Sequence, residues 1–430
     1  MYPLTPHPDL SPMSIAIASA YQPIVALDTR RVVGFEALTR APAGSPWERP
    51  QDMFAAAYRR RETAEFDWKC RLTAVRGALA VNFPVELALF VNAEPSALNT
   101  APPPGSGALL TDALRLSVVV EITERNLMRD PAGLLRAVEH ARHQGWRIAV
   151  DDVGSDSSSL ALLALLRPDV IKLDMRLVQQ QSTAQTASIL AAVTSESERT
   201  GAIVLAEGIE TEAHERWAQD VGAAWGQGWL YGEPGPLPVF GPKREPARQS
   251  HVRPAVTVRA PAAVTPYGLT HSVGAPRRAD GRLLETMEDD LLRRAAWMAS
   301  TALVLVTMPV SIELTDTRRR LMAQLGSRCA LTAVFSPHPD GAAYIGTGHH
   351  ADEHRAADGG HCVLVDPNEP LALERSVIVV DPGFTGALIS VDRGRRPDGT
   401  HLFDYRLSFD RELVLDAATV LLRRIPARAV

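Results

Sequence analysis

Short apolar runs that end in carboxylates recur through the first half of this 430-residue chain. Runs rich in valine and isoleucine are typical of buried strands. Acidic side chains repeated at the same end of successive strands are too costly in free energy to be core packing. The pattern therefore predicts a metal site at one end of a set of strands, which comprise residues 118–124, 148–152, 170–174 and 203–210.

Helical patterns separate these strands. In residues 129–146, Asp130 is placed to cap a helix, Pro131 takes its first position and Gly145 ends it. Apolar spacing and terminal glycines predict further helices at 157–166, 182–200 and 211–221. Upstream, the pattern predicts strands at 31–38 and 88–92, with a long helical stretch at 52–80 between them.

Repeated strand–helix units favour an α/β fold of the (β/α)₈ barrel type. An open doubly wound sheet is the weaker alternative, because no glycine-rich phosphate loop follows the first strand. In such barrels the catalytic groups lie at the C-terminal ends of the strands. The polar residues at or near these ends are Glu36, Asn92, Glu121, Asp151, Asp152, Asp174 and Glu207.

These residue types point to a particular chemistry. Any one of them alone is more often a loop acid or a helix cap, but their recurrence favours a shared site. Oxygen ligands without Cys or His select Mg²⁺, Mn²⁺ or Ca²⁺ over zinc. Asp151 and Asp152 are adjacent and cannot both point the same way, so one could bridge two ions about 4 Å apart, as in phosphoryl displacement. Lys172 and Asp174, two apart on one predicted strand, are both expected to face the interior, where Lys172 could serve a phosphate or form a structural ion pair.

Composition narrows the setting. The formal charge of −5 leaves no basic excess to neutralise phosphates, which argues against a general nucleic-acid or DNA binder. The three cysteines are far apart, which suits free thiols in a reducing compartment. No secretion signal is recognisable, and no apolar run approaches the roughly 20 residues that span a bilayer. A cytoplasmic protein without a membrane anchor is expected.

Eight motifs occur in the order that the EAL family shows, and the resemblance covers about residues 15–236. It implies a bacterial phosphodiesterase that hydrolyses cyclic di-GMP to linear pGpG with two Mg²⁺ or Mn²⁺ ions. It also implies a TIM-like barrel with an antiparallel first strand, and a homodimer. The motifs are Tyr21–Val25, Gly34–Arg40, Val91–Asn92, Glu121–Glu124, Asp151–Asp152, Ile171–Asp174, Ala206–Glu212 and Gln227–Gly232.

The resemblance implies roles for individual residues. Glu36, Asn92, Glu121 and Asp151 would bind one metal ion, and Asp151, Asp152 and Glu207 the second. Lys172 would assist the nucleophilic water, with Glu207, Asp174 and Glu210 as catalytic partners that accept protons or hold the ligands and Lys172 in register. Gln22, Arg40 and Gln227 would contact the substrate, and Glu124 would stabilise the loop after the Asp pair.

That loop departs from the family. The family continues the Asp pair with Phe-Gly-Thr-Gly-Tyr, whereas residues 153–157 here read Val-Gly-Ser-Asp-Ser. Asp156 restricts a backbone position that glycine leaves free, and Ser157 removes an aromatic packing anchor. Ser155 or Asp156 could equally just cap the next helix. Hydrolysis is the expected function, with weak or signal-dependent turnover as one outcome. The alternatives are an inactive barrel that serves as a cyclic di-GMP receptor or docking module, or a scaffold that binds no nucleotide.

A proline-rich linker divides the chain. We expect an N-terminal tail at 1–14, the barrel at 15–236, the linker at 237–266 and a second α/β or α+β domain at 267–430. In the second domain the pattern predicts helices at 283–300 and 411–424 and strands at 302–308 and 376–381. Residues 403–412 resemble the DICT sensory domain, which implies a regulatory module with an unidentified signalling partner.

Two further clusters of residues could be functional sites or ordinary surface segments. The first could bind zinc through a helix face but suits a mobile surface loop better; it consists of His349, His350, His354, His361 and Cys362. The second, Arg59–Arg61, is expected to be a solvated helix face rather than a nucleic-acid patch.

Overall fold

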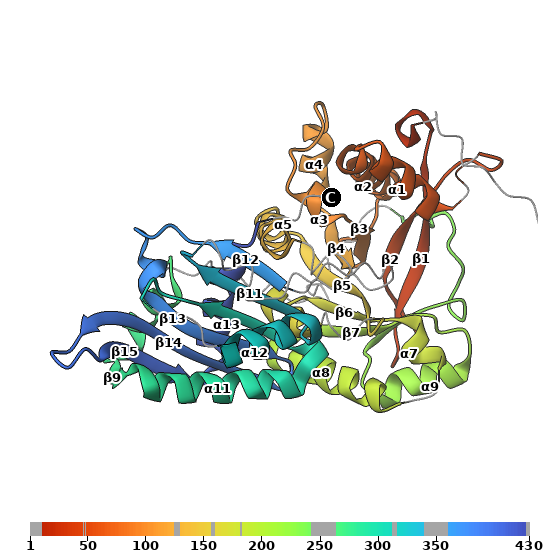
Figure 1. The fold of residues 1–430 in the computed structure, drawn as a ribbon. Helices are drawn as coiled ribbons and strands as arrows, with labels where there is room; N and C mark the ends of the chain where they lie inside the picture. The colour runs from red at the N-terminus through yellow and green to blue at the C-terminus, as the bar shows by residue number, and fades with distance from the viewer. Residues whose placement is uncertain are drawn as a thin grey trace, which may run out of the picture. The chain divides into compact units, whose positions relative to one another are not determined.

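The computed structural model describes residues 11–45, 47, 49–123, 130–155, 160–180, 183–241, 264–311, 316–338 and 360–426. Most of the described chain up to residue 241 forms a first compact unit, and residues 264–426 form most of a second (Figure 1). Several residues predicted above lie outside the described part of the chain, namely Glu124, Asp156, Ser157, His349, His350 and His354.

The first unit is a closed barrel in which eight strands follow one another in chain order. β1 pairs antiparallel with both β2 and β8, while every other neighbouring pair is parallel. The predicted barrel with one antiparallel first strand is therefore confirmed. The strands are β1 (Ala18–Ala26), β2 (Val32–Arg40), β3 (Ala88–Asn92), β4 (Ser117–Thr123), β5 (Arg147–Val153), β6 (Val170–Leu173), β7 (Ile203–Ala206) and β8 (Trp225–Gln227).

Helices occupy the connections between these strands. Gly201 ends α8 in the left-handed conformation at φ 76°, as the sequence predicts, and Thr211 caps α9 with its side chain. The helices are α1 (Pro50–Arg59), α2 (Thr63–Ala80), α3 (Pro95–Leu98), α4 (Gly107–Ala113), α5 (Pro131–His143), α6 (Leu160–Leu166), α7 (Met175–Gln179), α8 (Ala184–Thr200) and α9 (Glu212–Asp220), preceded by the 3₁₀ turn η1 (Pro12–Ser14).

The long helical stretch predicted at 52–80 consists of two helices. The chain forms α1 and α2 with a break between them, where Arg61 adopts a left-handed φ of 60°. Arg59–Arg61 are exposed, as expected, but they lie at the end of α1 and in the turn that follows rather than on one helix face.

The second unit is built on one seven-stranded sheet with the order β12-β11-β10-β13-β14-β15-β9. β10, β11 and β12 are parallel, and the remaining pairs are antiparallel. The strands are β9 (Arg277–Asp280), β10 (Leu303–Thr307), β11 (Leu331–Ser336), β12 (Gly360–Leu364), β13 (Glu374–Asp381), β14 (Phe384–Arg395) and β15 (His401–Ser408).

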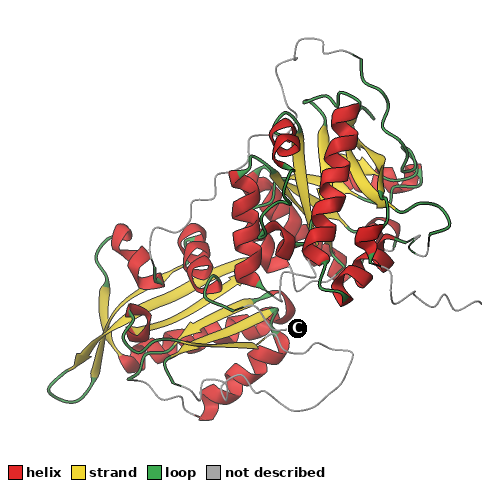
Figure 2. Cartoon of the chain, turned by 90° about the horizontal axis from the view of Figure 1, so that it is seen from above, coloured by secondary structure: helices red, strands yellow, loops and turns green. Residues whose placement is uncertain are grey.

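Helices pack on this sheet (Figure 2). α11 packs against five of the strands and shares a buried core with them, and α13 packs against β13 and β14. The two predicted strands correspond to β10 and β13, which are neighbours. The helical elements are α10 (Pro266–Leu269), η4 (Thr270–Val273), α11 (Gly281–Met298), η5 (Ala299–Thr301), α12 (Asp316–Arg328), η7 (Pro370–Leu373) and α13 (Arg411–Leu422).

Two residues of the histidine and cysteine cluster, His361 and Cys362, lie on β12 rather than in the surface loop that was expected, with His361 buried and Cys362 exposed. Within the described ranges, no helix has both the length and the apolar character that a membrane span requires.

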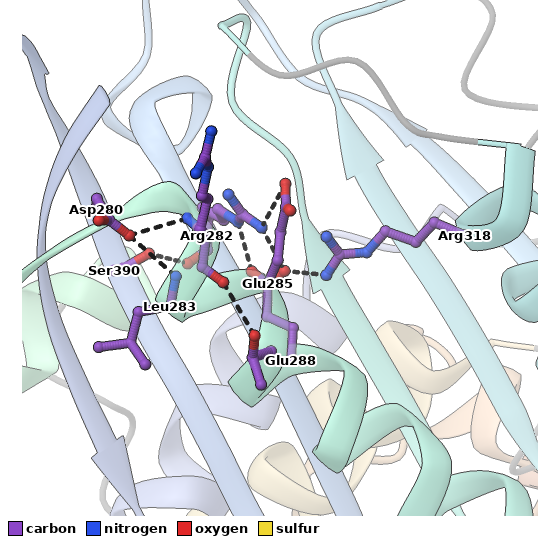
Figure 3. A network of polar contacts seen from close by, with 9 residues as sticks. Asp280, Arg282, Leu283, Glu285, Glu288, Arg318 and Ser390 are labelled. Carbon is purple, nitrogen blue, oxygen red and sulfur yellow. Dashed lines mark hydrogen bonds and ion pairs between the residues drawn. The ribbon is translucent and has the colours of Figure 1, made fainter. Parts of the chain in front are cut away.

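A buried ion network joins three elements of the second unit (Figure 3). Glu288 of α11 is 1% exposed and accepts two hydrogen bonds from Arg375 of β13, at 2.6 Å from Nε and 2.7 Å from Nη2. Arg318 of α12 also donates to Glu288. Because buried charges lose their hydration, each depends on its partners for compensation. The network therefore fixes α11 and α12 against the sheet.

Replacing Glu288 with alanine leaves two arginines without their main counter-charge. Breaking a buried pair by removing one partner costs about 3–5 kcal/mol, so we expect the free energy of opening of the β13 amides to fall by about that amount. Hydrogen exchange on the full-length protein measures it. Asp290→Ala on the same helix removes the solvent-exposed pair with Arg294 and should change it by less than about 0.5 kcal/mol. Equal effects of the two changes would contradict this role for Glu288.

Glu374 makes the stability of the second unit depend on pH. Burial raises the pKa of this carboxyl to about 7 from an ordinary 4.5, against hydrogen bonds from Thr265 and the Tyr267 amide. A folded-state pKa above the unfolded value stabilises the fold fully below about pH 4.5, and the stabilisation is lost as pH rises through 7. The loss is about 3 kcal/mol.

We therefore expect urea unfolding of the peptides beyond residue 264, followed by pulsed hydrogen exchange, to shift to lower urea between pH 5.5 and pH 8. Glu374→Gln should flatten this dependence, because the amide does not titrate. An unchanged pH profile in that variant would show that another group is responsible.

Candidate functional site

The interior of the barrel changes from apolar to polar at one layer. Because alternate residues of a strand share a face, the residue two positions beyond an interior one also points inward. Seven of the strands place a buried apolar side chain in one core cluster and have a polar residue two positions away, toward the same end of the barrel; Glu207 directly follows the last residue of β7, and the others lie on their strands. These pairs are Ile24 and Gln22, Phe90 and Asn92, Val119 and Glu121, Ala149 and Asp151, Val170 and Lys172, Leu205 and Glu207, and Trp225 and Gln227.

Lys172 lies at the centre of this polar layer and is fully buried. Its Nζ is 2.5 Å from Glu121 Oε1, 2.7 Å from Glu207 Oε1 and 2.9 Å from Asp151 Oδ1. The Oε2 atom of Glu36 lies at 3.8 Å. One ammonium group thus gathers carboxylates from four strands or strand ends.

Amide side chains hold Glu36 from both sides. Its Oε1 accepts a hydrogen bond from Asn92 Nδ2 at 3.0 Å, and its Oε2 accepts one from Gln227 Nε2 at 2.6 Å. Gln227 also donates to Gln22 Oε1 at 3.0 Å, across the seam where β8 closes on β1. Gln22 and Gln227, predicted to contact substrate, therefore also position a predicted metal ligand.

Burial and mutual repulsion shift the ionisation of these groups. Burial and the neighbouring charge of Glu36 raise the pKa of Glu121 well above its usual value, and burial with the charge of Asp151 does the same for Glu207, although Lys172 opposes both shifts. Burial alone would raise the pKa of Glu36 too, but Lys172 and the hydrogen bond from Gln227 outweigh it and lower that pKa.

Lys172 itself stays charged. Burial alone would lower the pKa of its ammonium group, but the carboxylates of Asp151, Glu121 and Glu207 outweigh burial and raise the pKa well above its usual value. The surroundings of Lys172 therefore favour its ammonium form, which offers a positive charge and N–H groups to the site.

The oxygen-rich centre fits divalent cations. Carboxylate oxygens of Asp151, Asp152 and Glu207 lie within 4.8 Å of one another. Among the buried atoms of the described residues, both Glu121 oxygens and Asp151 Oδ1 have no hydrogen-bond partner of acceptable geometry, even though Lys172 is close. Buried unpaired carboxylate oxygens are costly, and Mg²⁺ or Mn²⁺ would use them as ligands.

The backbone of β5 separates the two adjacent aspartates. Asp152 adopts a left-handed φ of 55°, which is uncommon for a residue other than glycine, and the pairing of β5 with β6 is irregular between Val150 and Val153. Such strained backbone positions concentrate at functional sites. The irregularity lets Asp151 face Lys172 while Asp152 reaches Glu207.

One predicted site residue, Asp174, lies just beyond the strand on which it was expected. β6 ends at Leu173, so Asp174 is not on the strand with Lys172; it caps α7 by accepting the Arg176 N–H at 2.7 Å and also pairs with the Arg176 side chain. Glu210 is exposed in the loop before α9, and Arg40 is half-buried at the end of β2. The sequence analysis did not predict the contact between Arg176 and Asp174, although an Asp at a helix start two residues before an Arg is a recognisable signal.

The start of the altered loop is closely packed. Gly154 has φ 103°, and a Cβ atom there would lie 2.3 Å from Leu177 Cδ1. Glycine is therefore required at this position by both backbone and space.

The chain is thus a closed α/β barrel with a buried layer of acids and amides at one end, and comparison with known families identifies the group to which this barrel belongs. The model of the EAL domain matches residues 15–234, about half of the chain. The chain belongs to the EAL domain family.

Similar proteins match over the same extent. RocR of Pseudomonas aeruginosa, a cyclic di-GMP phosphodiesterase, is 30% identical over 228 residues, which cover 51% of this chain and 58% of RocR. The probable cyclic di-GMP phosphodiesterase PdeN of Escherichia coli is 29% identical over 229 residues, 51% of this chain and 44% of PdeN. The chain thus spans about half the length of these curated relatives.

A solved structure of Klebsiella pneumoniae BlrP1 with manganese and cyclic di-GMP is also similar. The two chains are 30% identical with a TM-score of 0.45, and the match covers 54% of this chain and 58% of BlrP1.

Replacing Lys172 with methionine tests the charge balance of the site. Without added metal, the carboxylates of Glu121, Asp151 and Glu207 would lose their counter-charge. We therefore expect the free energy of unfolding to fall by about 3 kcal/mol or more. Because binding to the folded state alone stabilises it, Mn²⁺ should raise the unfolding temperature of Lys172→Met by more than that of the wild type.

Thermal unfolding with and without Mn²⁺ measures this difference. Lys69→Met is the control, since the Lys69 ammonium donates to the backbone carbonyls of Met13 and Ile15 and pairs with none of the carboxylates around Lys172 among the described residues. Metal-free Lys172→Met that unfolds at the wild-type temperature would contradict the charge balance.

Proposed function

We propose that the barrel is a metal-dependent phosphodiesterase that hydrolyses cyclic di-GMP to linear pGpG. The observation that carries this proposal is the buried layer in which Lys172 lies among carboxylates that keep unpaired oxygens. Membership of the EAL domain family and relatives named as cyclic di-GMP phosphodiesterases support the substrate.

Charge balance supports two divalent ions. Glu36, Glu121, Asp151, Asp152 and Glu207 with Lys172 leave a formal excess of four negative charges, which two Mg²⁺ or Mn²⁺ ions would neutralise. In this proposal Glu36, Asn92, Glu121 and Asp151 hold one ion, and Asp151, Asp152 and Glu207 hold the other. When bound, the ions would supply Lewis acidity and a water molecule of lowered pKa.

The protein's own residues would then orient the reactants. Lys172, which remains an ammonium, would donate hydrogen bonds to the phosphate or the attacking water and balance the charge that develops there. Because Gln22 and Gln227 are joined by a hydrogen bond beside Glu36, they would contact the substrate at the same edge of the site. Arg40 presents a planar fork of donors suited to phosphate.

Asp174 and Glu210 would act by holding neighbouring parts of the chain in position. By capping α7, Asp174 fixes the chain directly after Lys172. We propose that it keeps the Lys172 strand end in place, and that Glu210 and Glu124 support the loops beside the ligands.

The second unit would regulate the barrel. We propose that residues 267–430 form a sensory module of the DICT type, reached through the linker at 237–266, and that the protein works in the cytoplasm as a homodimer with a signalling partner. This proposal rests on the sequence resemblance and on the separate sheet of the second unit.

The altered loop supports a second candidate function. Val153 and Ser155 replace residues that the family uses after the Asp pair, while Gly154 is retained at a position that requires glycine. If this change uncouples the ligands from the loop, the barrel would bind cyclic di-GMP without hydrolysing it.

The turnover of cyclic di-GMP tests both candidates. With Mg²⁺ or Mn²⁺, the full-length protein should release pGpG, and Glu36→Ala or Lys172→Ala should reduce kcat by at least about 100-fold, because each removes a group of the reacting centre. Asp112→Ala, which breaks an exposed ion pair, should leave kcat unchanged.

Chromatographic detection of pGpG, with calorimetric binding in Ca²⁺ alongside, is the measurement. Folded wild type that is inert with both catalytic metals would rule out the phosphodiesterase. Binding without turnover would establish the receptor, and the absence of binding would leave a scaffold.

A further inference from the structure

A carboxylate from a distant helix holds the turn that follows β3. Asp67 lies on α2 and is 1% exposed, and its Oδ1 accepts the backbone N–H of Glu94 at 2.9 Å. Glu94 comes two residues after Asn92 and directly precedes α3. Asp67 belongs to none of the motifs described above.

Asp67 is held by an arginine that is buried with it. Arg71, one turn further along α2, is 3% exposed and donates from Nε to Asp67 Oδ2 at 2.7 Å. Its guanidinium carbon lies 3.9 Å from the centre of the Trp68 ring. A buried ion pair adds little net stability compared with apolar residues of similar volume. The pair therefore contributes mainly geometry, because it aims a charged acceptor at the Glu94 amide.

This contact bears directly on Asn92. The backbone amide of Ala93, which lies between Asn92 and Glu94, donates to the Glu121 carbonyl at 3.0 Å. The Asn92 side chain donates to Glu36 Oε1 at 3.0 Å. The turn directly after Asn92 is thus fixed at Ala93 by β4 and at Glu94 by Asp67. Because hydrogen bonds weaken steeply with distance and angle, movement of this turn would separate Asn92 from Glu36.

The same helix also holds the far end of α3. Trp68 Nε1 donates to Thr100 Oγ1 at 3.0 Å, and Thr100 donates to the Ala97 carbonyl at 2.7 Å. Adjacent residues of α2 therefore anchor both ends of the segment that follows Asn92.

We propose that Asp67 is a positioning residue for Asn92, which it keeps in register with Glu36 by fixing the Glu94 amide. The effect of Asp67 on catalysis rests on the proposed function. The positioning of Asn92 by Asp67 depends only on these contacts. Residues that orient metal ligands from outside typically change metal affinity or activity by 10–100-fold when removed.

The asparagine side chains provide a direct readout in the full-length protein. The chain has five asparagines, so labelling their side-chain amides with ¹⁵N gives five NH₂ signals, and Asn92→Ala assigns the relevant one; the residues are Asn82, Asn92, Asn99, Asn126 and Asn368. In Asp67→Ala the Asn92 signal should shift and exchange faster with solvent. In Asp67→Asn it should stay near its wild-type position, because the amide oxygen can still accept the Glu94 N–H.

A buried acid elsewhere in the barrel is the matched control. Glu196 is 2% exposed and pairs with Arg199 within α8, so Glu196→Ala should lower stability and leave the Asn92 signal unchanged. If Asp67→Ala does not fold, Asp67→Leu combined with Arg71→Met removes both charges at little cost in stability. It should produce the same change in the Asn92 signal.

Mn²⁺ binding, followed by electron paramagnetic resonance of the free ion, gives the functional readout. Asp67→Ala should bind about 10-fold more weakly than wild type, with turnover that recovers at high Mn²⁺, and Glu196→Ala should match wild type. A purely structural role would lower the unfolding temperature of both variants alike and leave the Asn92 signal and Mn²⁺ affinity of Asp67→Ala unchanged, which would overturn the proposal. Wild type that binds no Mn²⁺ and shows no turnover would instead refute the proposed function, and the Asn92 signal would still decide the role of Asp67.

Discussion

The contact of one ammonium group with carboxylates from several strands is the interaction on which the site depends. Lys172 Nζ lies within 3 Å of Glu121, Asp151 and Glu207, in a layer directly above the apolar core of the barrel. The alternation of side chains along each strand creates this layer, because the residue two positions past the core must also point inward. A single positive charge does not balance the formal charge of these acids, and this excess is the basis for the proposal that divalent cations bind here.

Side chains and backbone beside the Lys172 cluster determine the direction in which each of its carboxylates points. Gln227 holds one side of Glu36 and Asn92 the other. The left-handed backbone at Asp152 turns two neighbouring aspartates toward different partners. The left-handed backbone at Asp152 costs stability on its own, and such strain is typical of functional sites, where the surrounding structure holds it in place.

The sequence was sufficient for the barrel and for placing acids at the ends of its strands, because continuous apolar runs and terminal glycines are local signals. It was insufficient where structure depends on partners far along the chain. β8 has three residues and β1 contains Pro23, so neither has a recognisable strand pattern, yet their pairing closes the barrel. The hydrogen bond from Gln227 to Glu36 exists only because of that closure. Asp174 was misplaced by one residue, since a helix cap and a strand end look alike in sequence.

Anomalous X-ray scattering from crystals of the full-length protein with Mn²⁺ would test the central claim most directly. Two peaks are predicted, one within coordination distance of Glu36, Asn92 and Glu121 and one beside Asp152 and Glu207, with Asp151 between them. Saturating Mn²⁺ that gives no peak at Asp151, with Lys172 still enclosed by the carboxylates, would contradict the account.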